Sequence, residues 1–260
     1  MGSSVARTRV GLGDATHPRV SVVIPALNEA DNLPHVLATL PPEIHELILV
    51  DGNSVDGTSE VARSHYPDVR IVGQSGRGKG DALQAGFAAC SGDIVVMMDA
   101  DGSTDGGEIS RFVEALVGGA DYAKGSRFVA GGGSDDLTPL RRMGNRFLCA
   151  IVNTLFDTTY TDLCYGYNAF WRRVLPALEI ECRGFEVETL LNVRAAKAGL
   201  AVVEVPSVER NRLFGESKLR PLRDGLRILR VILRESQDRQ PWVTPAMEPV
   251  SAEAGSVQGA

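Results

Sequence analysis

The sequence predicts an α/β fold with a doubly wound, mostly parallel sheet and helices on both faces. Three observations support this fold class. Short β-branched runs alternate with helical patterns through the first half of the chain. Segment 94–98 is apolar throughout, as a strand covered on both faces requires. The chain of 260 residues, 43% of them hydrophobic, is long enough to bury a sizeable core.

The first half shows the alternation most clearly. Its β-branched or apolar runs predict four strands, at 20–25, 47–50, 69–72 and 94–98. Helical patterns separate them, at 28–40, 56–65 and 80–90. Asn28 is expected to cap the first helix. Ligands of such sheets bind beyond the carboxyl ends of the strands, and here every strand end carries polar or glycine-rich sequence.

The second half is less regular. We expect strands at 122–125, 167–171 and 201–205, and helices at 138–156, 185–198 and 221–235. A polar loop, 209–218, precedes the last helix. The prediction is therefore a flexible leader at 1–19, a single domain at 20–235 and a disordered tail at 236–260.

Composition excludes several classes of protein. The net charge of −6 argues against bulk nucleic-acid binding, so we expect no nucleic-acid partner. No apolar run is long enough to cross a bilayer, and the N-terminus lacks the apolar region of a secretory signal. The four cysteines show no metal-ligand spacing and are interpreted as buried thiols. Together these features predict a cytoplasmic protein.

Two acidic residues follow the most apolar strand. Asp99 and Asp101 would converge in front of the sheet, where Mg²⁺ or Mn²⁺ could bind their carboxylates together with substrate phosphates. A solvated acidic turn is the alternative, and it is the commoner meaning of such a pair taken alone.

A glycine-rich loop precedes the third helix. Segment 73–79 fits G-x-x-x-x-G-K, but Gly80 stands where a nucleotide hydrolase needs Ser or Thr. We therefore expect backbone amides and Lys79 to help hold a ligand's phosphate, rather than NTP hydrolysis. The simpler alternative is a flexible turn with one exposed lysine.

Taken together, the strand ends resemble family 2 glycosyltransferases with the GT-A fold. The residues that carry the resemblance are Pro25-Ala-Leu-Asn28-Glu29, the stretch from Val50 to Thr58, Gly76-Arg-Gly78-Lys79-Gly80 and Asp99-Ala-Asp101. The second half is similar to polyprenyl-phosphate sugar synthases of the dolichyl-phosphate-mannose-synthase type. The residues that carry this second similarity are Gly125-Ser126-Arg127-Phe128, the pair Arg141-Arg142, and the stretch from Arg212 to Lys218.

The resemblance implies a nucleotide-sugar site. The donor would be bound by Pro25, Leu27, Glu29, Val50, Asp51, Lys79, Asp99 and Ala100. Asp101, with Ser103 nearby, would bind a Mg²⁺ or Mn²⁺ ion that bridges the diphosphate. Arg212 and Lys218 would act from a mobile loop over that diphosphate.

The acceptor leaves two alternatives open. A polyprenyl phosphate is already anionic, so Arg127, Arg141 or Arg142 would only need to position it. A soluble hydroxyl acceptor would need a carboxylate base such as Asp162, Glu186 or Glu188. For the last two, a solvated helix start is the favoured interpretation. The expected reaction is inverting transfer of a hexose from GDP-mannose or UDP-glucose to a polyprenyl phosphate, with the soluble acceptor as the alternative. An inactive nucleotide-sugar-binding protein is a third, disfavoured interpretation.

The last helix carries two parallel stripes. Leucines recur at 219, 222, 226, 229 and 233, and arginines one residue later at 220, 223, 227, 230 and 234. Packing of the leucines on the core, with solvated arginines, is slightly favoured. The alternative is peripheral contact of 219–234 with an anionic membrane at the inner face.

Overall fold

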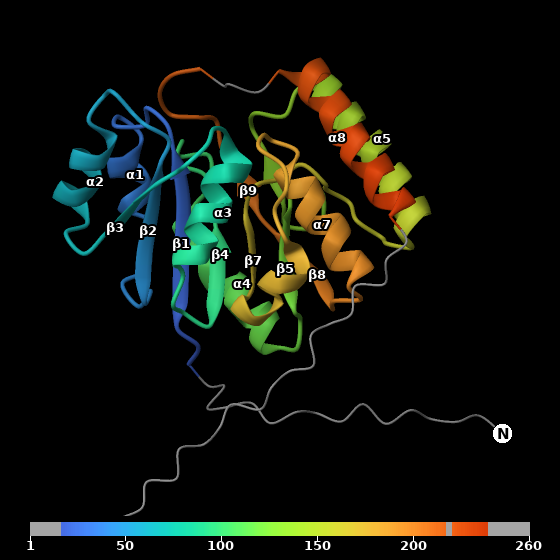
Figure 1. Ribbon diagram of the computed structural model, residues 1–260, viewed down its shortest axis with the longest axis horizontal. Coiled ribbons are helices and arrows are strands. Elements are labelled where there is room, and N and C mark those ends of the chain that lie inside the picture. Colours follow the sequence, from blue (N-terminus) through green and yellow to red (C-terminus); the bar gives the residue numbers. More distant parts are fainter. Residues whose placement is uncertain (1–16, 217–219, 239–260) are drawn as a thin grey trace, which may run out of the picture.

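The computed structural model of the chain describes residues 17–216 and 220–238 (Figure 1). Most of the predicted leader and tail, together with Lys218 and Leu219, lies outside these residues. Within the described ranges, no helix combines the length and the apolar character that a bilayer-spanning segment needs.

A seven-stranded sheet forms the centre of the molecule. Its order is β3-β2-β1-β4-β7-β5-β8, and β7 alone runs antiparallel to its neighbours. The mostly parallel, doubly wound prediction is therefore confirmed. The strands are β1 (Val20–Ala26), β2 (Glu46–Asp51), β3 (Arg70–Gly73), β4 (Ile94–Met97), β5 (Tyr122–Ser126), β7 (Asn168–Trp171) and β8 (Val202–Pro206). A separate pair joins β6 (Gly133–Ser134) to β9 (Val208–Glu209).

Helices cover both faces of this sheet (Figure 1). They are α1 (Leu33–Leu37), α2 (Thr58–His65), α3 (Lys79–Ala89), α4 (Ile109–Val117), α5 (Pro139–Phe156), α6 (Leu175–Leu178), α7 (Val187–Lys197) and α8 (Pro221–Gln237). Two 3₁₀ turns, Gly106–Glu108 and Arg172–Val174, precede α4 and α6. Helices α5 and α8 lie side by side at one end of the molecule and pack against α7.

Aromatic side chains fix α3 and α4 on opposite faces of β7. Phe87 of α3 meets Phe170 edge-on, with ring centroids 5.2 Å apart. On the other face, Phe112 of α4 stacks on Tyr167 at 4.5 Å. Between these layers, side chains such as Val96 are fully buried, which explains why segment 94–98 is apolar throughout.

A second, smaller core joins α5, α7 and α8. Its buried residues include Val152 of α5, Val193 of α7, and Ile228 and Ile232 of α8. The side of α8 that faces the protein is therefore built from isoleucine and valine, and only Leu229 of the described leucines packs against this cluster. The expectation that the leucine stripe as a whole packs on the core is wrong.

One predicted helix is much shorter than expected. Helix α1 covers Leu33–Leu37 instead of 28–40, and Asn28 does not cap it. Asn28 has a φ of 55°, a left-handed conformation incompatible with a helix start. Its amide donates to Ser54 Oγ at 2.9 Å, and its side-chain oxygen accepts the N–H of Val55 at 2.9 Å. The loops after β1 and β2 are thus tied together.

Helix α3 approaches the sheet closely at Gly86, and this contact gives a stability prediction. A Cβ at Gly86 would lie 2.4 Å from Val23 Cγ1 and 2.9 Å from Val50 Cγ2. Gly86→Ala is therefore expected to lower the free energy of unfolding by about 1–3 kcal/mol, measured by chemical denaturation. Gly144→Ala in α5 is the control, because no atom lies within 4 Å of its Cβ, and it should stabilise by up to about 1 kcal/mol. Equal effects of both substitutions would contradict the close packing at Gly86.

Candidate active site

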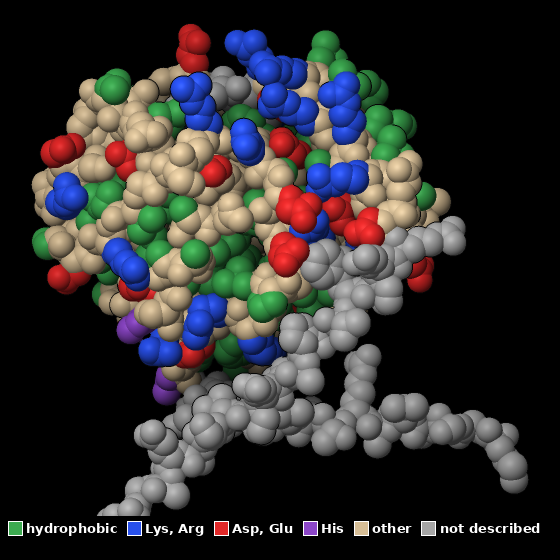
Figure 2. Space-filling model, in the orientation of Figure 1, with side chains coloured by type: hydrophobic (Ala, Val, Ile, Leu, Met, Phe, Trp, Pro, Cys, Tyr) green, Lys and Arg blue, Asp and Glu red, His purple; other side chains and the backbone are tan. Residues whose placement is uncertain are grey.

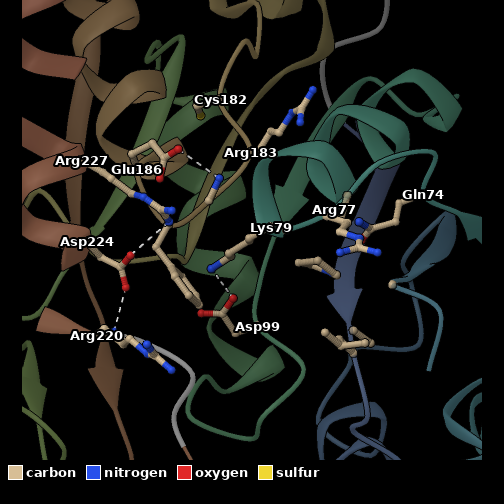
Figure 3. Close-up of a pocket in the computed structure, with 18 of the residues that line it drawn as sticks. Gln74, Arg77, Lys79, Asp99, Cys182, Arg183, Glu186, Arg220, Asp224 and Arg227 are labelled. Carbon is tan, nitrogen blue, oxygen red and sulfur yellow. Dashed lines mark hydrogen bonds and ion pairs between the residues drawn. The ribbon is translucent and has the colours of Figure 1, made fainter. Parts of the chain in front are cut away.

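An open cavity of about 1160 Å³ lies beyond the carboxyl ends of β1, β2, β3 and β4. The sequence predicted a ligand site at this edge of the sheet. Figure 3 shows Gln74 and Arg77 on one side of the cavity and Asp224 and Arg227 of α8 on the other, with Lys79 and Asp99 between them. The cavity therefore reaches from the first strands of the sheet to the last helix.

A buried cation forms the floor of this cavity. The ammonium of Lys79, at the start of α3, contacts Asp99 Oδ1 and lies 2.7 Å from Glu188 Oε1 of α7. Glu188 is buried, so the expected solvated helix start is wrong for this residue. An acid between Val187 and the pair Leu190-Leu191 was the signal that it needed a cation.

Burial and charge act in opposite directions on Lys79. Burial alone would lower the pKa of the Lys79 ammonium, but the charges of Asp99 and Glu188 outweigh it and the pKa is raised. Burial raises the pKa of Glu188, against the opposing effect of Lys79. Lys79 is therefore a permanent cation at neutral pH, and its charge is already shared by two carboxylates.

A second ion-pair centre lies in the cavity lining, beyond the ends of β1 and β4. Arg212 contacts Glu29 Oε2 and lies 3.2 Å from Asp101 Oδ2, and its Nε donates to the carbonyl of Phe214 at 2.6 Å. The amide of Phe214 in turn donates to Asn32 Oδ1 at 2.9 Å. The loop predicted to close over the donor thus lies across the ends of β1 and β4 in this structure.

The two predicted metal-site carboxylates face the cavity. The side chains of Asp99 and Asp101 are 30% and 24% exposed. Among the described residues, no group of three His, Cys, Asp or Glu side chains is placed to hold a metal ion. One or two carboxylates plus substrate phosphates is a common Mg²⁺ site, so Asp101 suits a metal that a diphosphate completes. Ser103 contributes a backbone N–H to Asp101 Oδ1 at 3.0 Å and does not line the cavity.

Most of the predicted donor-binding residues line the cavity, and two do not. The residues that do are Pro25, Leu27, Glu29, Lys79, Asp99 and Ala100. The Val50 side chain is fully buried in the core. Asp51 accepts hydrogen bonds from the Ser54 amide at 3.0 Å and the Ser59 hydroxyl at 3.1 Å, and so shapes the following loop. Gly52 and Asn53, which the sequence analysis did not select, line the cavity instead.

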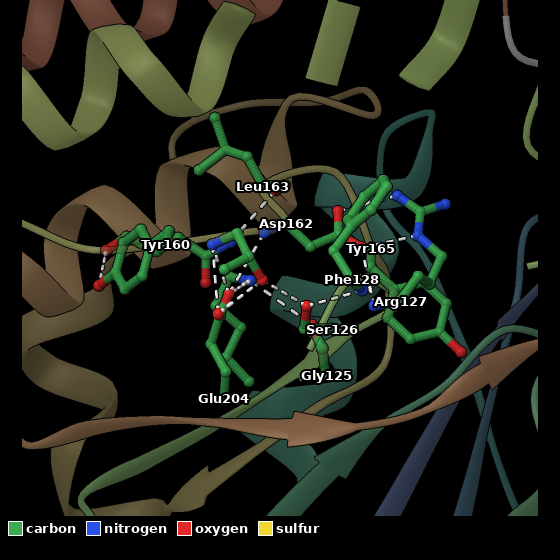
Figure 4. Close-up of polar contacts among 12 residues, drawn as sticks. Gly125, Ser126, Arg127, Phe128, Tyr160, Asp162, Leu163, Tyr165 and Glu204 are labelled. Atoms are coloured by element: carbon green, nitrogen blue, oxygen red, sulfur yellow. Dashed lines mark hydrogen bonds and ion pairs between the residues drawn. The ribbon is translucent and has the colours of Figure 1, made fainter. Parts of the chain in front are cut away.

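Arg127 lies outside the cavity and is fully engaged (Figure 4). Its Nε is 2.7 Å from Asp162 Oδ2, and its Nη1 is 2.9 Å from Glu209 Oε2. The guanidinium also stacks over Tyr165 at 4.9 Å. Burial alone would raise the pKa of Asp162, but hydrogen bonds and charge from Arg127 hold it low. In this structure Arg127 and Asp162 form a buried ion pair, and the acceptor-binding and base roles expected for them stay predictions.

The arginine pair at the start of α5 also lies away from the cavity. Arg141 Nη1 pairs with Asp136 Oδ2 at 2.6 Å. Arg142 lies over the Phe128 ring at 5.4 Å and borders a separate hollow of about 420 Å³. The predicted acceptor-phosphate residues do not line the cavity that holds Asp99 and Asp101.

Residues 181–185, which were not selected from the sequence, and the candidate base Glu186 complete the far end of the cavity. The segment 181–186 lines it, and its backbone crosses the glycine-rich loop closely. A Cβ at Gly78 would lie 2.1 Å from the carbonyl oxygen of Arg183, and one at Gly80 would lie 2.2 Å from that of Cys182. Glycine in this loop therefore permits contact with 182–183, which explains the pattern that resembled a phosphate-binding loop.

The fold and the charged cavity define a class of protein. A mostly parallel seven-stranded sheet with a cavity at the carboxyl ends of its strands is the architecture of GT-A glycosyltransferases. The protein is an enzyme of this class, a glycosyltransferase. The chain belongs to glycosyl transferase family 2, whose model matches residues 21–178. The family predicted from the strand ends is confirmed.

Relatives of known name place it more narrowly. The polyprenol monophosphomannose synthase of Mycolicibacterium smegmatis is 35% identical over 77% of this chain and 81% of that one. The undecaprenyl-phosphate mannosyltransferase of Micrococcus luteus is 33% identical, over 77% and 87% of the two chains. The crystal structure of glucosyl-3-phosphoglycerate synthase from Mycobacterium tuberculosis with Mg²⁺ and uridine diphosphate has a TM-score of 0.67. It is 25% identical and covers 85% of this chain and 80% of its own.

The buried cation gives the prediction of this subsection. Lys79→Met would leave Glu188 and Asp99 without their cation and is expected to lower the free energy of unfolding by about 3–5 kcal/mol. Adding Glu188→Gln to the same chain should recover much of that loss without restoring catalysis. Urea denaturation of the native chain, Lys79→Met, Glu188→Gln and the double variant measures the coupling. A Lys79→Met protein as stable as the native chain would show that the pairs contribute little.

Proposed function

We propose that this family 2 glycosyltransferase moves a hexose from a nucleotide sugar to a polyprenyl phosphate, with a divalent metal and with inversion. The observation that carries the proposal is the cavity in which Asp99, Asp101 and Arg212 meet at the strand ends. The polyprenyl acceptor is supported by the names of the two mannosyltransferase relatives. The bound Mg²⁺ and uridine diphosphate of the structural neighbour support the donor and the metal.

The charges in the cavity suit departure of a diphosphate. An acceptor phosphate oxygen would attack the anomeric carbon while the bond from that carbon to the diphosphate oxygen breaks. The bonding electron pair leaves with the nucleoside diphosphate, so a glycosyl phosphodiester forms and no proton has to move. The metal would neutralise charge on the leaving diphosphate. Arg212, which already reaches Asp101, is placed to add a second positive charge.

The carboxylates support a phosphate acceptor over a hydroxyl acceptor. A hydroxyl needs a base, and the predicted candidates were Asp162, Glu186 and Glu188. Asp162 is paired with Arg127 and Glu188 with Lys79, so neither carries an unshared negative charge. A phosphate monoester is anionic at neutral pH and needs no base.

One observation favours the alternative of a soluble hydroxyl acceptor. Glu186 lines the cavity, and its Oε1 accepts the N–H of Gly184 at 3.1 Å. Its Oε2 is buried and has no hydrogen-bond partner among the described residues. This oxygen suits a hydroxyl group, either of an acceptor or of the transferred sugar.

An exposed apolar surface on α5 and α8 supports peripheral contact with the membrane that carries a polyprenyl phosphate. We call it the outer apolar face. It is formed by Leu140, Met143 and Phe147 of α5 and Leu222, Leu226 and Leu233 of α8, which are between 46% and 77% exposed. Figure 2 shows hydrophobic side chains along this margin, next to a group of basic ones. The arginine stripe of α8 borders the cavity instead of facing outward with these leucines.

A panel of donors and acceptors tests the function. GDP-mannose and UDP-glucose are each incubated with undecaprenyl phosphate or with a hydroxyl acceptor, and the products are identified by mass spectrometry. We expect a hexosyl lipid phosphate that requires Mn²⁺ or Mg²⁺ and disappears with EDTA. Asp101→Ala should lower turnover on the order of 10²-fold or more at unchanged stability. Full turnover in EDTA, or transfer only to the hydroxyl acceptor, would contradict the proposal.

The outer apolar face gives a separate prediction. Leu222→Gln with Leu226→Gln should weaken cosedimentation with anionic vesicles at least tenfold, because each buried leucine contributes about 1.5–3 kcal/mol. Val117→Gln, at an exposed apolar site on α4, serves as the matched control. Vesicle binding that is the same for the double variant, the control and the native chain would remove this face as the contact.

A further inference from the structure

The loop that carries Arg212 is held largely through its backbone. The side chains of Leu213 and Phe214 are 49% and 47% exposed, so their burial supplies only part of the free energy that keeps the loop in place. The N–H of Leu213 donates to the carbonyl of Asp101 at 3.2 Å. The N–H of Phe214 donates to a side chain instead, that of Asn32. Asn32 is therefore a contact on which the position of the loop depends.

Asn32 pairs with Phe214 as one peptide group pairs with another. Its Oδ1 accepts the N–H of Phe214 at 2.9 Å, and its Nδ2 donates to the carbonyl of the same residue at 3.2 Å. The Asn32 side chain is buried just before α1, and Phe214 lies 182 positions later in the sequence. A buried amide whose donor and acceptor are both satisfied is a specific contact, because losing either partner leaves a polar group unpaired.

The same side chain reaches two of the groups that hold Arg212. Asn32 Nδ2 also donates to Glu29 Oε2 at 2.7 Å, and this oxygen contacts the Arg212 guanidinium. The carbonyl of Phe214, which accepts from Asn32, accepts Arg212 Nε at 2.6 Å as well. Asn32 thus orients both acceptors. The third partner of Arg212 among the described residues is Asp101, at 3.2 Å.

Asp101 is the partner that ligand binding would involve. It is the carboxylate that suits a divalent metal, and its Oδ1 already accepts the backbone N–H of Ser103. Asp101 Oδ2 cannot serve Arg212 and a metal ion equally, so metal binding would weaken their ion pair. The contacts of Arg212 with Glu29 and with the carbonyl of Phe214 do not involve Asp101. These two contacts would therefore keep the guanidinium at the cavity.

We propose that Asn32 is a positioning residue, which holds Arg212 at the cavity for the diphosphate of the donor. This inference deepens the proposed function and rests on it for the identity of that ligand. Asn32 does not line the cavity, so it acts through Phe214 and Glu29 and not by touching the ligand. A guanidinium that is already in place loses less side-chain entropy when it binds a phosphate.

Hydrogen exchange at the Phe214 amide tests the contact in the full chain without a ligand. The test variant is Asn32→Ala. Asn32→Asp is the conservative variant, because it keeps an oxygen for the Phe214 N–H but loses the Nδ2 donor. The matched control is Asn153→Ala. Asn153 of α5 makes the same two bonds to Tyr160, at 2.9 and 3.0 Å, and does not line the cavity.

The Phe214 amide should exchange about tenfold faster in Asn32→Ala than in the native chain, as expected for loss of a buried hydrogen bond. Asn32→Asp should give an intermediate rate, and Asn153→Ala should leave the native rate unchanged. The amides of β4 monitor the fold and should stay protected in every variant, because this strand lies within the sheet.

Binding of a nucleoside diphosphate tests the link to Arg212. GDP and UDP carry the charge that the leaving group gains, and each is titrated calorimetrically with Mn²⁺. Asn32→Ala and Arg212→Ala should each weaken binding on the order of tenfold. The double variant should bind no more weakly than Arg212→Ala alone, because Asn32 acts through Arg212. Asn153→Ala should bind as the native chain does.

Two outcomes would overturn the inference: a native exchange rate of the Phe214 amide in Asn32→Ala, or losses of affinity that add in the double variant. A native chain that binds neither GDP nor UDP would instead reject the proposed donor, and the exchange rate would still decide whether Asn32 holds the loop. Coupling of Asn32 to Arg212 without sugar transfer to undecaprenyl phosphate would keep the positioning role and reject the proposed acceptor.

Discussion

The ammonium group of Lys79 holds together the three elements on which the cavity depends. Lys79 begins α3, Asp99 follows β4, and Glu188 lies in the first turn of α7. The backbone at Gly166 passes so close that a Cβ there would lie 2.8 Å from the ammonium nitrogen. Because the ammonium has little contact with solvent, removing it would leave two carboxylates without their counter-charge. The ammonium therefore fixes α3, the end of β4 and α7 relative to one another at the floor of the cavity.

Cationic side chains with carboxylate partners and those without them have different roles in this molecule. Arg127 is buried and the Lys79 side chain is only 12% exposed, and each is balanced by two carboxylates, so they join segments distant in the sequence. Arg212 is balanced too, but from a loop at the cavity entrance. Arg223 and Arg230 reach the same cavity with no carboxylate partner among the described residues.

The sequence predicted the strands and the family well because both depend on local pattern. Runs such as 94–98 have no alternative to a buried strand, and Asp99 and Asp101 follow one directly. Long-range pairing was not visible: Arg127 finds its partners 35 and 82 positions away. The face of α8 was also ambiguous, because Ile228, Val231 and Ile232 compete with the leucine stripe for the core. Asn28 was assigned to a helix because its contact with the loop after β2 cannot be read locally. Helix α4, which packs on β5 and β7, was not predicted at all.

Each arginine of the α8 stripe follows a leucine by one residue. The surfaces that these two kinds of side chain occupy therefore depend on the length of the helix. Successive residues of an α-helix are about 100° apart around its axis. A single insertion or deletion between Arg223 and Ile228 would rotate the part of the helix before it by about 100° relative to the part after it. Arginine would then move towards the lipid side and leucine into the cavity, or the isoleucine anchor would leave its core. A substitution on α8 changes one contact, whereas a change in its length would exchange the roles of its faces.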